Sequence, residues 1–197
     1  MSARIGVLAL QGAFQAHADC IRAVGHDARE VRTPADLAGV DALVMPGGES
    51  STMSQLLESS MLFDDIATRL ESGFPVFGTC AGMILLANEI VDGRNDQRCF
   101  SALDITVRRN AYGRQVDSFE ADIDSLIPGQ EGVFHGVFIR APKIERTGEA
   151  VQVLGRWNDE PVLVRQNSVL AASFHPELSG DVRLHAYFIS SVCQGKE

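Results

Sequence analysis

The sequence has few cysteines, few basic residues and no long apolar run, and each shortage excludes a class of protein. Its four cysteines in 197 residues contain no C-x-x-C pair, which argues against a disulfide scaffold and a cysteine metal site. Lys and Arg number 17 against 26 Asp and Glu, a net charge of −9, so the basic face of a nucleic-acid or anionic-membrane binder is not expected. No stretch approaches the ~18 apolar residues of a membrane span, and the run at residues 5–10 is too short for a signal peptide. We therefore expect a cytoplasmic protein whose partners are proteins and small molecules.

Apolar runs alternate with amphipathic stretches through the first half of the chain. Strands are predicted at residues 5–10, 28–32, 42–45 and 75–78, and helices at 13–24, 52–57, 62–71 and from 81 to 90. Because the strands are almost continuously apolar and alternate with helices, they predict an α/β fold with a mostly parallel central sheet and helices on both faces.

The second half is richer in glycine and short β-prone runs. Strands are predicted at 103–107, 133–139, 151–156, 162–166 and 169–174, and a closing helix at 182–192. The last three strands are expected to pair antiparallel and to extend the sheet. Since no repeat or linker interrupts the chain, residues 1–197 are predicted to form one domain.

Cys80 is the sharpest chemical feature of the sequence. It lies at the centre of Gly-Thr-Cys-Ala-Gly, residues 78–82, between an apolar strand and an apolar helix. In such a strand-to-helix elbow the central side chain is exposed on a strained turn, and the flanking glycines make room for it. A helix N-terminus also favours the thiolate, which is the reactive form of cysteine. A nucleophile and a buried structural cysteine are equally compatible with this motif alone.

Two other segments follow predicted strands. In His-Pro-Glu, residues 175–177, the side chains of His175 and Glu177 can face one site, and a carboxylate beside an imidazole orients it and stabilises its protonated form. By itself this pair also fits a surface ion pair. Pro-Gly-Gly-Glu-Ser-Ser-Thr, residues 46–52, could present backbone N–H groups to an anion or a developing oxyanion, or simply form a capped turn. All three segments fall where parallel strands end, which is where α/β sheets bind ligands.

The remaining histidines receive no functional role from the sequence. His17 and His185 fall within predicted helices, His26 in a turn and His135 before an apolar strand. None belongs to an H-x-H or H-E-x-x-H motif, so we expect no metal and no other cofactor.

An elbow cysteine, a later His-Pro-Glu and a Pro-Gly-Gly loop, in this order, resemble the class I, triad-type glutamine amidotransferases, whose sheet is flavodoxin-like. Longer segments narrow the resemblance to the glutaminase subunits of pyridoxal 5′-phosphate synthases. They are L-Q-G-A at 10–13, P-G-G-E-S-S-T at 46–52, G-T-C-A-G at 78–82, R-N-A-Y-G-R-Q at 109–115, G-V-F-I-R-A-P at 136–142 and S-F-H-P-E-L at 173–178.

The resemblance implies a role for each matching position. Cys80 would be the nucleophile, His175 the general base and acid, and Glu177 the carboxylate that orients His175. The oxyanion would be held by backbone N–H groups of Gly48 and Ala81. Gln11 is a hypothetical link between partner docking and assembly of the oxyanion hole. Contacts to L-glutamine are implied at Gly48, Glu49, Ser50, Arg109, Ile139 and Arg140.

The implied activity is hydrolysis of L-glutamine to L-glutamate and ammonia through a thioester. Because these motifs occupy residues 11–177, the ammonia acceptor is expected on another chain, which the resemblance identifies as the synthase subunit that makes pyridoxal 5′-phosphate. Three alternatives remain: a glutaminase for histidine or nucleotide synthesis, a γ-glutamyl hydrolase or cysteine peptidase, and a non-catalytic subunit with a vestigial triad.

Overall fold

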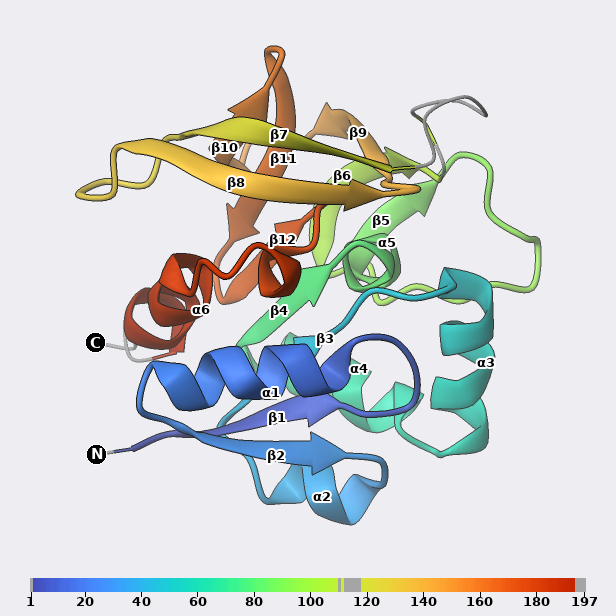
Figure 1. Cartoon of the computed structure of the whole chain (residues 1–197). Helices are drawn as coiled ribbons and strands as arrows, with labels where there is room; N and C mark the ends of the chain where they lie inside the picture. The colour runs from blue at the N-terminus through green and yellow to red at the C-terminus, as the bar shows by residue number, and fades with distance from the viewer. Residues whose placement is uncertain (1, 110, 112–117, 194–197) are drawn as a thin grey trace.

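A computed structural model gives the fold of the chain and describes residues 2–109, 111 and 118–193 (Figure 1). Within these residues nine strands form one sheet of order β2-β1-β3-β4-β12-β11-β10-β7-β8, and three form a small sheet of order β5-β6-β9. The strands are β1 (Arg4–Leu8), β2 (Asp27–Val31), β3 (Ala42–Met45), β4 (Val76–Thr79), β5 (Ala87–Ile90), β6 (Leu103–Arg108), β7 (Ser118–Ser125), β8 (Gly132–Ile139), β9 (Lys143–Thr147), β10 (Gln152–Trp157), β11 (Glu160–Gln166) and β12 (Val169–Ala172). The helices are α1 (Phe14–Ala23), α2 (Pro34–Ala38), α3 (Ser50–Ser59), α4 (Phe63–Glu71), α5 (Ala81–Leu86), η1 (Pro176–Leu178), α6 (Arg183–Tyr187) and η2 (Phe188–Cys193).

The large sheet consists of a parallel part and an antiparallel part that meet at β12. β2, β1, β3, β4 and β12 are parallel to their neighbours in this order. β12 then pairs antiparallel with β11, and β10, β7 and β8 continue in the same manner. The predicted parallel core with an antiparallel extension is therefore confirmed.

Helices cover both faces of the sheet (Figure 1). Side chains of α1 and α6 belong to the apolar cluster on one face, with Ile21 and Leu184 among them. Side chains of α2, α3, α4 and α5 belong to the cluster on the other face, with Leu57 and Ile66 among them. Every residue of β3 and β4 is buried, as expected of strands covered on both sides.

One predicted helix was too long, and two strands were not predicted. The helix expected to reach residue 90 ends at Leu86, because Ala87 turns to extended geometry and β5 pairs with β6. The predicted closing helix is confirmed, and it continues after Tyr187 in wider π-helical turns. β7 and β9 were not predicted, although β7 alternates Phe119, Ala121 and Ile123 with polar residues, which is the pattern of a half-buried strand.

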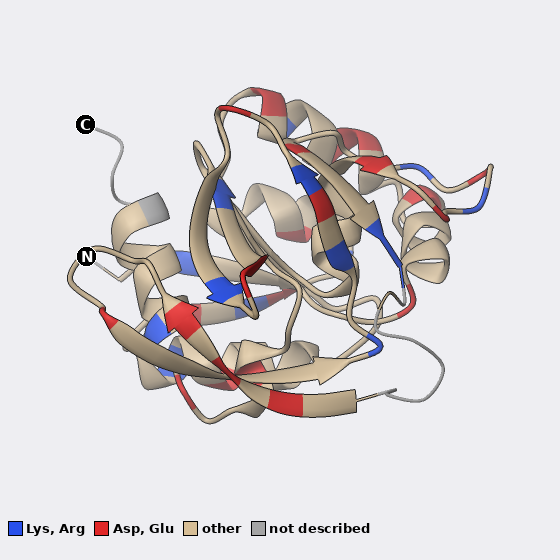
Figure 2. Cartoon of the chain, turned by 90° about the horizontal axis from the view of Figure 1, so that it is seen from above, with Lys and Arg blue, Asp and Glu red and all other residues tan. Residues whose placement is uncertain are grey.

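Charged side chains of both signs are interspersed over the strands and helices seen in Figure 2. The described helices include none that is long and apolar enough to cross a membrane.

Candidate active site

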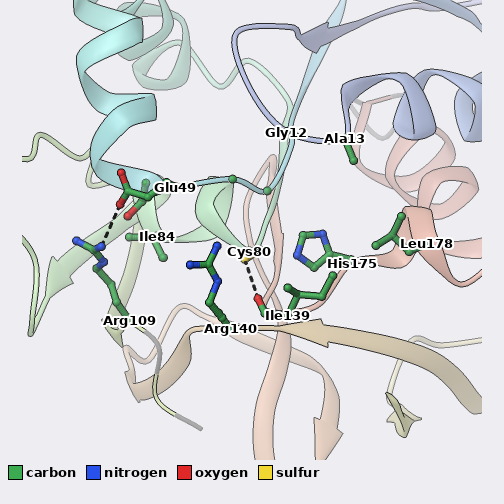
Figure 3. A pocket seen from close by; sticks show the side chains of 13 residues that line it. Gly12, Ala13, Glu49, Cys80, Ile84, Arg109, Ile139, Arg140, His175 and Leu178 are labelled. Atoms are coloured by element: carbon green, nitrogen blue, oxygen red, sulfur yellow. Dashed lines mark hydrogen bonds and ion pairs between the residues drawn. The ribbon is translucent and has the colours of Figure 1, made fainter. Parts of the chain in front are cut away.

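Cys80 lies at the elbow between β4 and α5, as its motif predicts. Its backbone has φ +50° and ψ −103°, a left-handed region that non-glycine residues enter at a cost of about 1–3 kcal/mol. The neighbouring strand holds this turn, because the Cys80 N–H donates to the Ala172 carbonyl at 2.8 Å. The thiol is thereby fixed at the N-terminus of α5 and faces the pocket (Figure 3).

The two glycines of the elbow are required by close packing. A Cβ at Gly78 would lie 2.7 Å from the backbone carbon of Gly82, and one at Gly82 would overlap the Met45 carbonyl oxygen. Helix α5 therefore approaches β4 and β3 more closely than any side chain at either position would permit.

His175 and Glu177 follow β12, the strand next to the one that carries Cys80. The Nδ1–H of His175 donates to Glu177 Oε1 at 2.8 Å. The backbone N–H of His175 donates to the Val137 carbonyl of β8 at 2.8 Å, which ties the imidazole to the antiparallel part of the sheet. A Cβ at Gly47 would overlap the His175 ring and lie 3.3 Å from Cys80 Cβ, so the loop after β3 brings its backbone against both residues.

Charge stabilises the protonated form of His175. Burial lowers its pKa, but the hydrogen bonds and negative charges of Cys80 and Glu177 outweigh that effect and raise the pKa to about 10. Burial would raise the pKa of Glu177, but the hydrogen bond from His175 and the positive charge of the His175 imidazolium hold it below the ordinary value. At neutral pH the pair is therefore an imidazolium and a carboxylate.

The other end of the pocket is built around Glu49 and Arg109. Glu49 caps α3, accepting hydrogen bonds from the backbone N–H groups of Ser51 and Thr52 at 3.1 and 2.7 Å. Burial opposes ionisation of Glu49, but a hydrogen bond from the Thr52 hydroxyl at 2.8 Å, together with these backbone groups, lowers its pKa to about 2. Arg109 Nη2 donates to Glu49 Oε1 at 3.0 Å, while Nη1 donates to Ser51 Oγ at 3.0 Å and Gln97 Oε1 at 3.2 Å. Three separate segments thus hold one ion pair at the pocket wall.

Ile139 and Arg140 enter the pocket from the end of β8 (Figure 3). The Ile139 carbonyl oxygen lies 3.9 Å from Cys80 Sγ. Arg140 has φ +44°, an uncommon value for arginine, and the turn carries its side chain toward the space between Glu49 and Cys80.

The residues expected to form the oxyanion hole lie near the thiol. Gly48 lines the pocket, and Ala81 is the first residue of α5 and follows Cys80 directly. The Gln11 side chain packs on Gly48, since a Cβ there would come within 3.1 Å of Gln11 Cδ. Gln11 Oε1 is buried and has no hydrogen-bond partner among the described residues.

The pocket has a volume of about 290 Å³, close to the lower end of the ~300–1,000 Å³ typical of small-molecule sites. It brings together the predicted positions Gly48, Glu49, Ser50, Cys80, Arg109, Ile139, Arg140 and His175. Glu177 lies behind His175. Gly12, Ala13, Gly47 and Leu178 also line the pocket; they lie in the segments that carried the resemblance, but no role was predicted for them. Ile84 lines it as well and was not named from the sequence. Of the segment 109–115, only Arg109 and Ala111 lie within the described residues.

A cysteine at a strand-to-helix elbow, with a His–Glu pair at the end of the adjacent parallel strand, defines a triad-type amidotransferase. Comparison with known proteins agrees with this class. The chain belongs to the SNO glutamine amidotransferase family, whose model matches residues 7–194.

Similar proteins cover essentially the whole chain. A protein of Mycobacteroides abscessus named pyridoxal 5′-phosphate synthase subunit PdxT is 53% identical over 99% of this chain and 100% of its own length. A protein of the same name from Thermosipho africanus is 50% identical over 96% and 98%. A crystal structure of a glutamine amidotransferase superposes with a TM-score of 0.90 at 50% identity, covering 96% of this chain and 98% of the other. A putative GMP synthase protein from Thermoplasma acidophilum, TM-score 0.69, covers 99% and 96% at 15% identity and shares the fold alone.

Proposed function

We propose that this chain is the glutaminase subunit of a pyridoxal 5′-phosphate synthase and hydrolyses L-glutamine to L-glutamate and ammonia. The observation that carries the proposal is that Cys80 and His175 line one amino-acid-sized pocket, with Glu177 hydrogen-bonded to His175 from behind. The full-length relatives named as PdxT subunits support the pathway.

The two ends of the pocket suit the two ends of glutamine. The α-amino and α-carboxylate groups bind at the end formed by Glu49, Arg109 and Arg140, where both signs of charge are present. Ser50 and Ile139 also line the pocket. This orientation directs the side-chain amide toward the Cys80 sulfur.

The chemistry follows from the protonation state of the pair. The Cys80 thiolate attacks the amide carbon, and the negative charge that develops on the oxygen is stabilised by the N–H groups of Gly48 and Ala81. The imidazolium of His175 gives its proton to the departing nitrogen, ammonia leaves, and a thioester remains. His175, now neutral, removes a proton from water as the water attacks the thioester, which releases glutamate and restores the thiolate. Glu177 keeps the imidazole oriented throughout.

Ammonia is the product that a second chain consumes. The relatives' names describe a subunit of a synthase, so we infer a complex in which ammonia passes to the synthase subunit, with Gln11 as a hypothetical link to docking. We further propose that residues 1–197 act as one glutaminase domain, since the nine-stranded sheet is continuous from β2 to β8. A cytoplasmic location is supported by Cys20, Cys80 and Cys99, which are free thiols.

The direct test measures ammonia release from glutamine by the chain alone and after addition of a synthase subunit. We expect turnover that the partner stimulates and that Cys80→Ala removes, while Cys99→Ala, which changes a thiol outside the pocket, retains it. Full hydrolysis by Cys80→Ala would overturn the catalytic assignment. Stimulation only by a histidine or nucleotide synthase would overturn the pathway, and partner-independent cleavage of γ-glutamyl peptides in place of glutamine would overturn both.

A further inference from the structure

Two histidines without a part in the proposed chemistry lie buried behind Glu177. His17 belongs to α1 and His185 to α6, and both residues are fully buried. His17 Nδ1 lies 2.9 Å from His185 Nε2. His17 Nε2 lies 3.2 Å from Glu177 Oε2 and 3.2 Å from Thr79 Oγ1. Polar groups therefore continue from the pocket through Glu177 into the interior between α1 and α6, which stand side by side in Figure 1.

Both histidines are neutral at physiological pH. Burial lowers the pKa of His17 to about 4, although Glu177 raises it and His175 lowers it further. Burial and the neighbouring His17 lower the pKa of His185 to about 3, against smaller opposing effects of Glu177 and Asp181. Each neutral imidazole carries one N–H, so the hydrogen bond between His17 Nδ1 and His185 Nε2 has its proton on only one of these two nitrogens. The groups around the two rings decide which nitrogen it is.

The charge of Glu177 settles that position. A bare Nε2 lone pair on His17 would face an anionic carboxylate oxygen at 3.2 Å and repel it. The opposite tautomer would also place the proton of His185 on Nδ1, a buried atom with no hydrogen-bond partner among the described residues. The proton of His17 therefore resides on Nε2, which has Glu177 Oε2 and the Thr79 hydroxyl oxygen both at 3.2 Å, and Nδ1 accepts a hydrogen bond from the Nε2–H of His185. In this arrangement His185 fixes the tautomer of His17, and His17 presents an N–H group to Glu177.

The second carboxylate oxygen of Glu177 lacks a well-aligned hydrogen-bond donor within the part of the chain that the structure describes. Its Oε1 accepts the hydrogen bond of His175, whereas Oε2 is buried and receives no well-aligned hydrogen bond from the described residues. A buried carboxylate with one uncompensated oxygen is costly, and the terminal torsion of glutamate is soft enough for the group to rotate. The N–H of His17 opposes that rotation by electrostatic attraction from the side opposite His175.

We propose that His17 is a positioning residue of this active site: its Nε2–H, oriented by His185, holds the second oxygen of Glu177 and so keeps the first oxygen on His175. The proposal rests on the proposed function of the triad. His17 contacts neither substrate nor thiol and acts through Glu177 and His175.

The test compares two variants of similar size, His17→Gln and His17→Met. Glutamine offers an N–H donor and a carbonyl acceptor, as the neutral imidazole does, while methionine offers neither. For glutamine hydrolysis by the complex, we expect His17→Met to lower kcat roughly 10- to 100-fold, the range found when partners behind metal ligands are removed. KM should stay within about twofold, and His17→Gln should recover most of the loss, because only the hydrogen-bonding groups differ.

Alkylation of Cys80 by iodoacetamide, followed by mass spectrometry, gives a readout that requires no glutaminase activity. In His17→Met, Glu177 is held less firmly and stabilises the His175 imidazolium less. A smaller fraction of Cys80 is then thiolate, the form that iodoacetamide alkylates. Cys80 of His17→Met should therefore be alkylated several-fold more slowly at pH 7 than Cys80 of the wild type or of His17→Gln. Wild-type protein that fails to hydrolyse glutamine would refute the proposed function and leave this contrast measurable.

A second pair of variants, at His185, keeps the proposal testable if His17→Met does not fold. His185→Met removes the donor that fixes the His17 tautomer, and His185→Gln retains an N–H at the same place. We expect the same order of kcat and alkylation rate in this pair, with smaller differences. Equal kcat and equal alkylation rates for the methionine and glutamine variants in both pairs would show that the two histidines only fill the core, and the proposal would be wrong.

Discussion

The two ends of the active-site pocket are built in different ways. At one end Cys80, His175 and Glu177 are 6%, 8% and 7% exposed and are backed by buried neutral histidines. At the other end the side chains of Glu49 and Arg109 are 40% and 18% exposed and form an ion pair that sits among other polar groups. The buried end fixes geometry and strengthens charge interactions that change during a reaction, whereas the more open end offers fixed charges to a zwitterion.

The buried end should respond in kcat, and most strongly to the loss of the Glu177 charge. Glu177→Gln preserves size but removes the negative charge that raises the pKa of His175 to about 10. By analogy with the Asp-to-Asn change in a serine protease triad, kcat should fall about 10⁴-fold. The alkaline limb of the kcat/KM profile, on which the imidazolium loses its proton, should move to lower pH. Steady-state ammonia release between pH 6 and pH 10.5 measures both effects.

Glu30→Gln is the control for that variant, since it neutralises an exposed carboxylate paired with Arg32 on β2. It should leave both kcat and the pH profile unchanged. A Glu177→Gln enzyme that keeps the wild-type alkaline limb would show that Glu177 does not set the protonation of His175.

The buried end should also make stability sensitive to acid. In the folded state His17 has a pKa of about 4, below the ~6.5 of an unfolded chain, so between these values the unfolded state binds more protons. Stability is therefore retained above pH 6.5 and falls as the pH decreases toward 4. For His17 alone the loss between pH 7 and pH 5 is about 2 kcal/mol. Urea unfolding at the two pH values should show a difference smaller by about this amount in His17→Gln, and an unchanged difference would contradict the neutral state of His17.

The sequence predicted the catalytic residues at the buried end, but it did not predict the two histidines behind them. Cys80, His175 and Glu177 stand in motifs whose order and spacing carry chemistry, and the parallel strands that position them are strongly apolar. His17 and His185 are 168 positions apart in helices, and local sequence contains no signal that two such residues meet. A histidine on the apolar face of α1 was the one available clue. The role of Gln97 could not be predicted for the same reason. Its contact with Arg109 depends on how the loop that contains Gln97 folds back toward the pocket.

The helix that was predicted too long had the same physical origin. Residues 87–90, Ala-Asn-Glu-Ile, follow an apolar run and suit a helix or a strand, and pairing with β6 selects the strand. β7 is a different case: Phe119, Ala121 and Ile123 alternate with polar residues along it, so the sequence contained a strand signal that the prediction did not include, although β7 forms much of the antiparallel part.

The open end should respond in KM. Arg109→Lys retains a positive charge but loses the planar group that reaches Glu49, Ser51 and Gln97 together. Because these contacts hold a binding wall and touch no reacting atom, we expect KM for glutamine to rise about tenfold with little change in kcat. Arg108→Lys is a matched control, since the neighbouring arginine pairs with Glu145. A fall in kcat at constant KM in Arg109→Lys would place Arg109 at the buried end instead.

The smallest effect expected is the coupling between the two ends. His17→Met and Arg109→Lys change groups with no shared hydrogen-bond partner among the described residues, so their free-energy effects on kcat/KM should add to within about 0.5 kcal/mol, roughly a twofold deviation from the product of the single effects. Glu49→Gln combined with Arg109→Lys should deviate more, because both changes damage one ion pair. The comparison of these two double-mutant cycles in the same assay decides whether the pocket has two independent ends. If the cross-pocket cycle deviated as strongly as the ion-pair cycle, binding at the open end would have to alter the positions of His175 and Glu177.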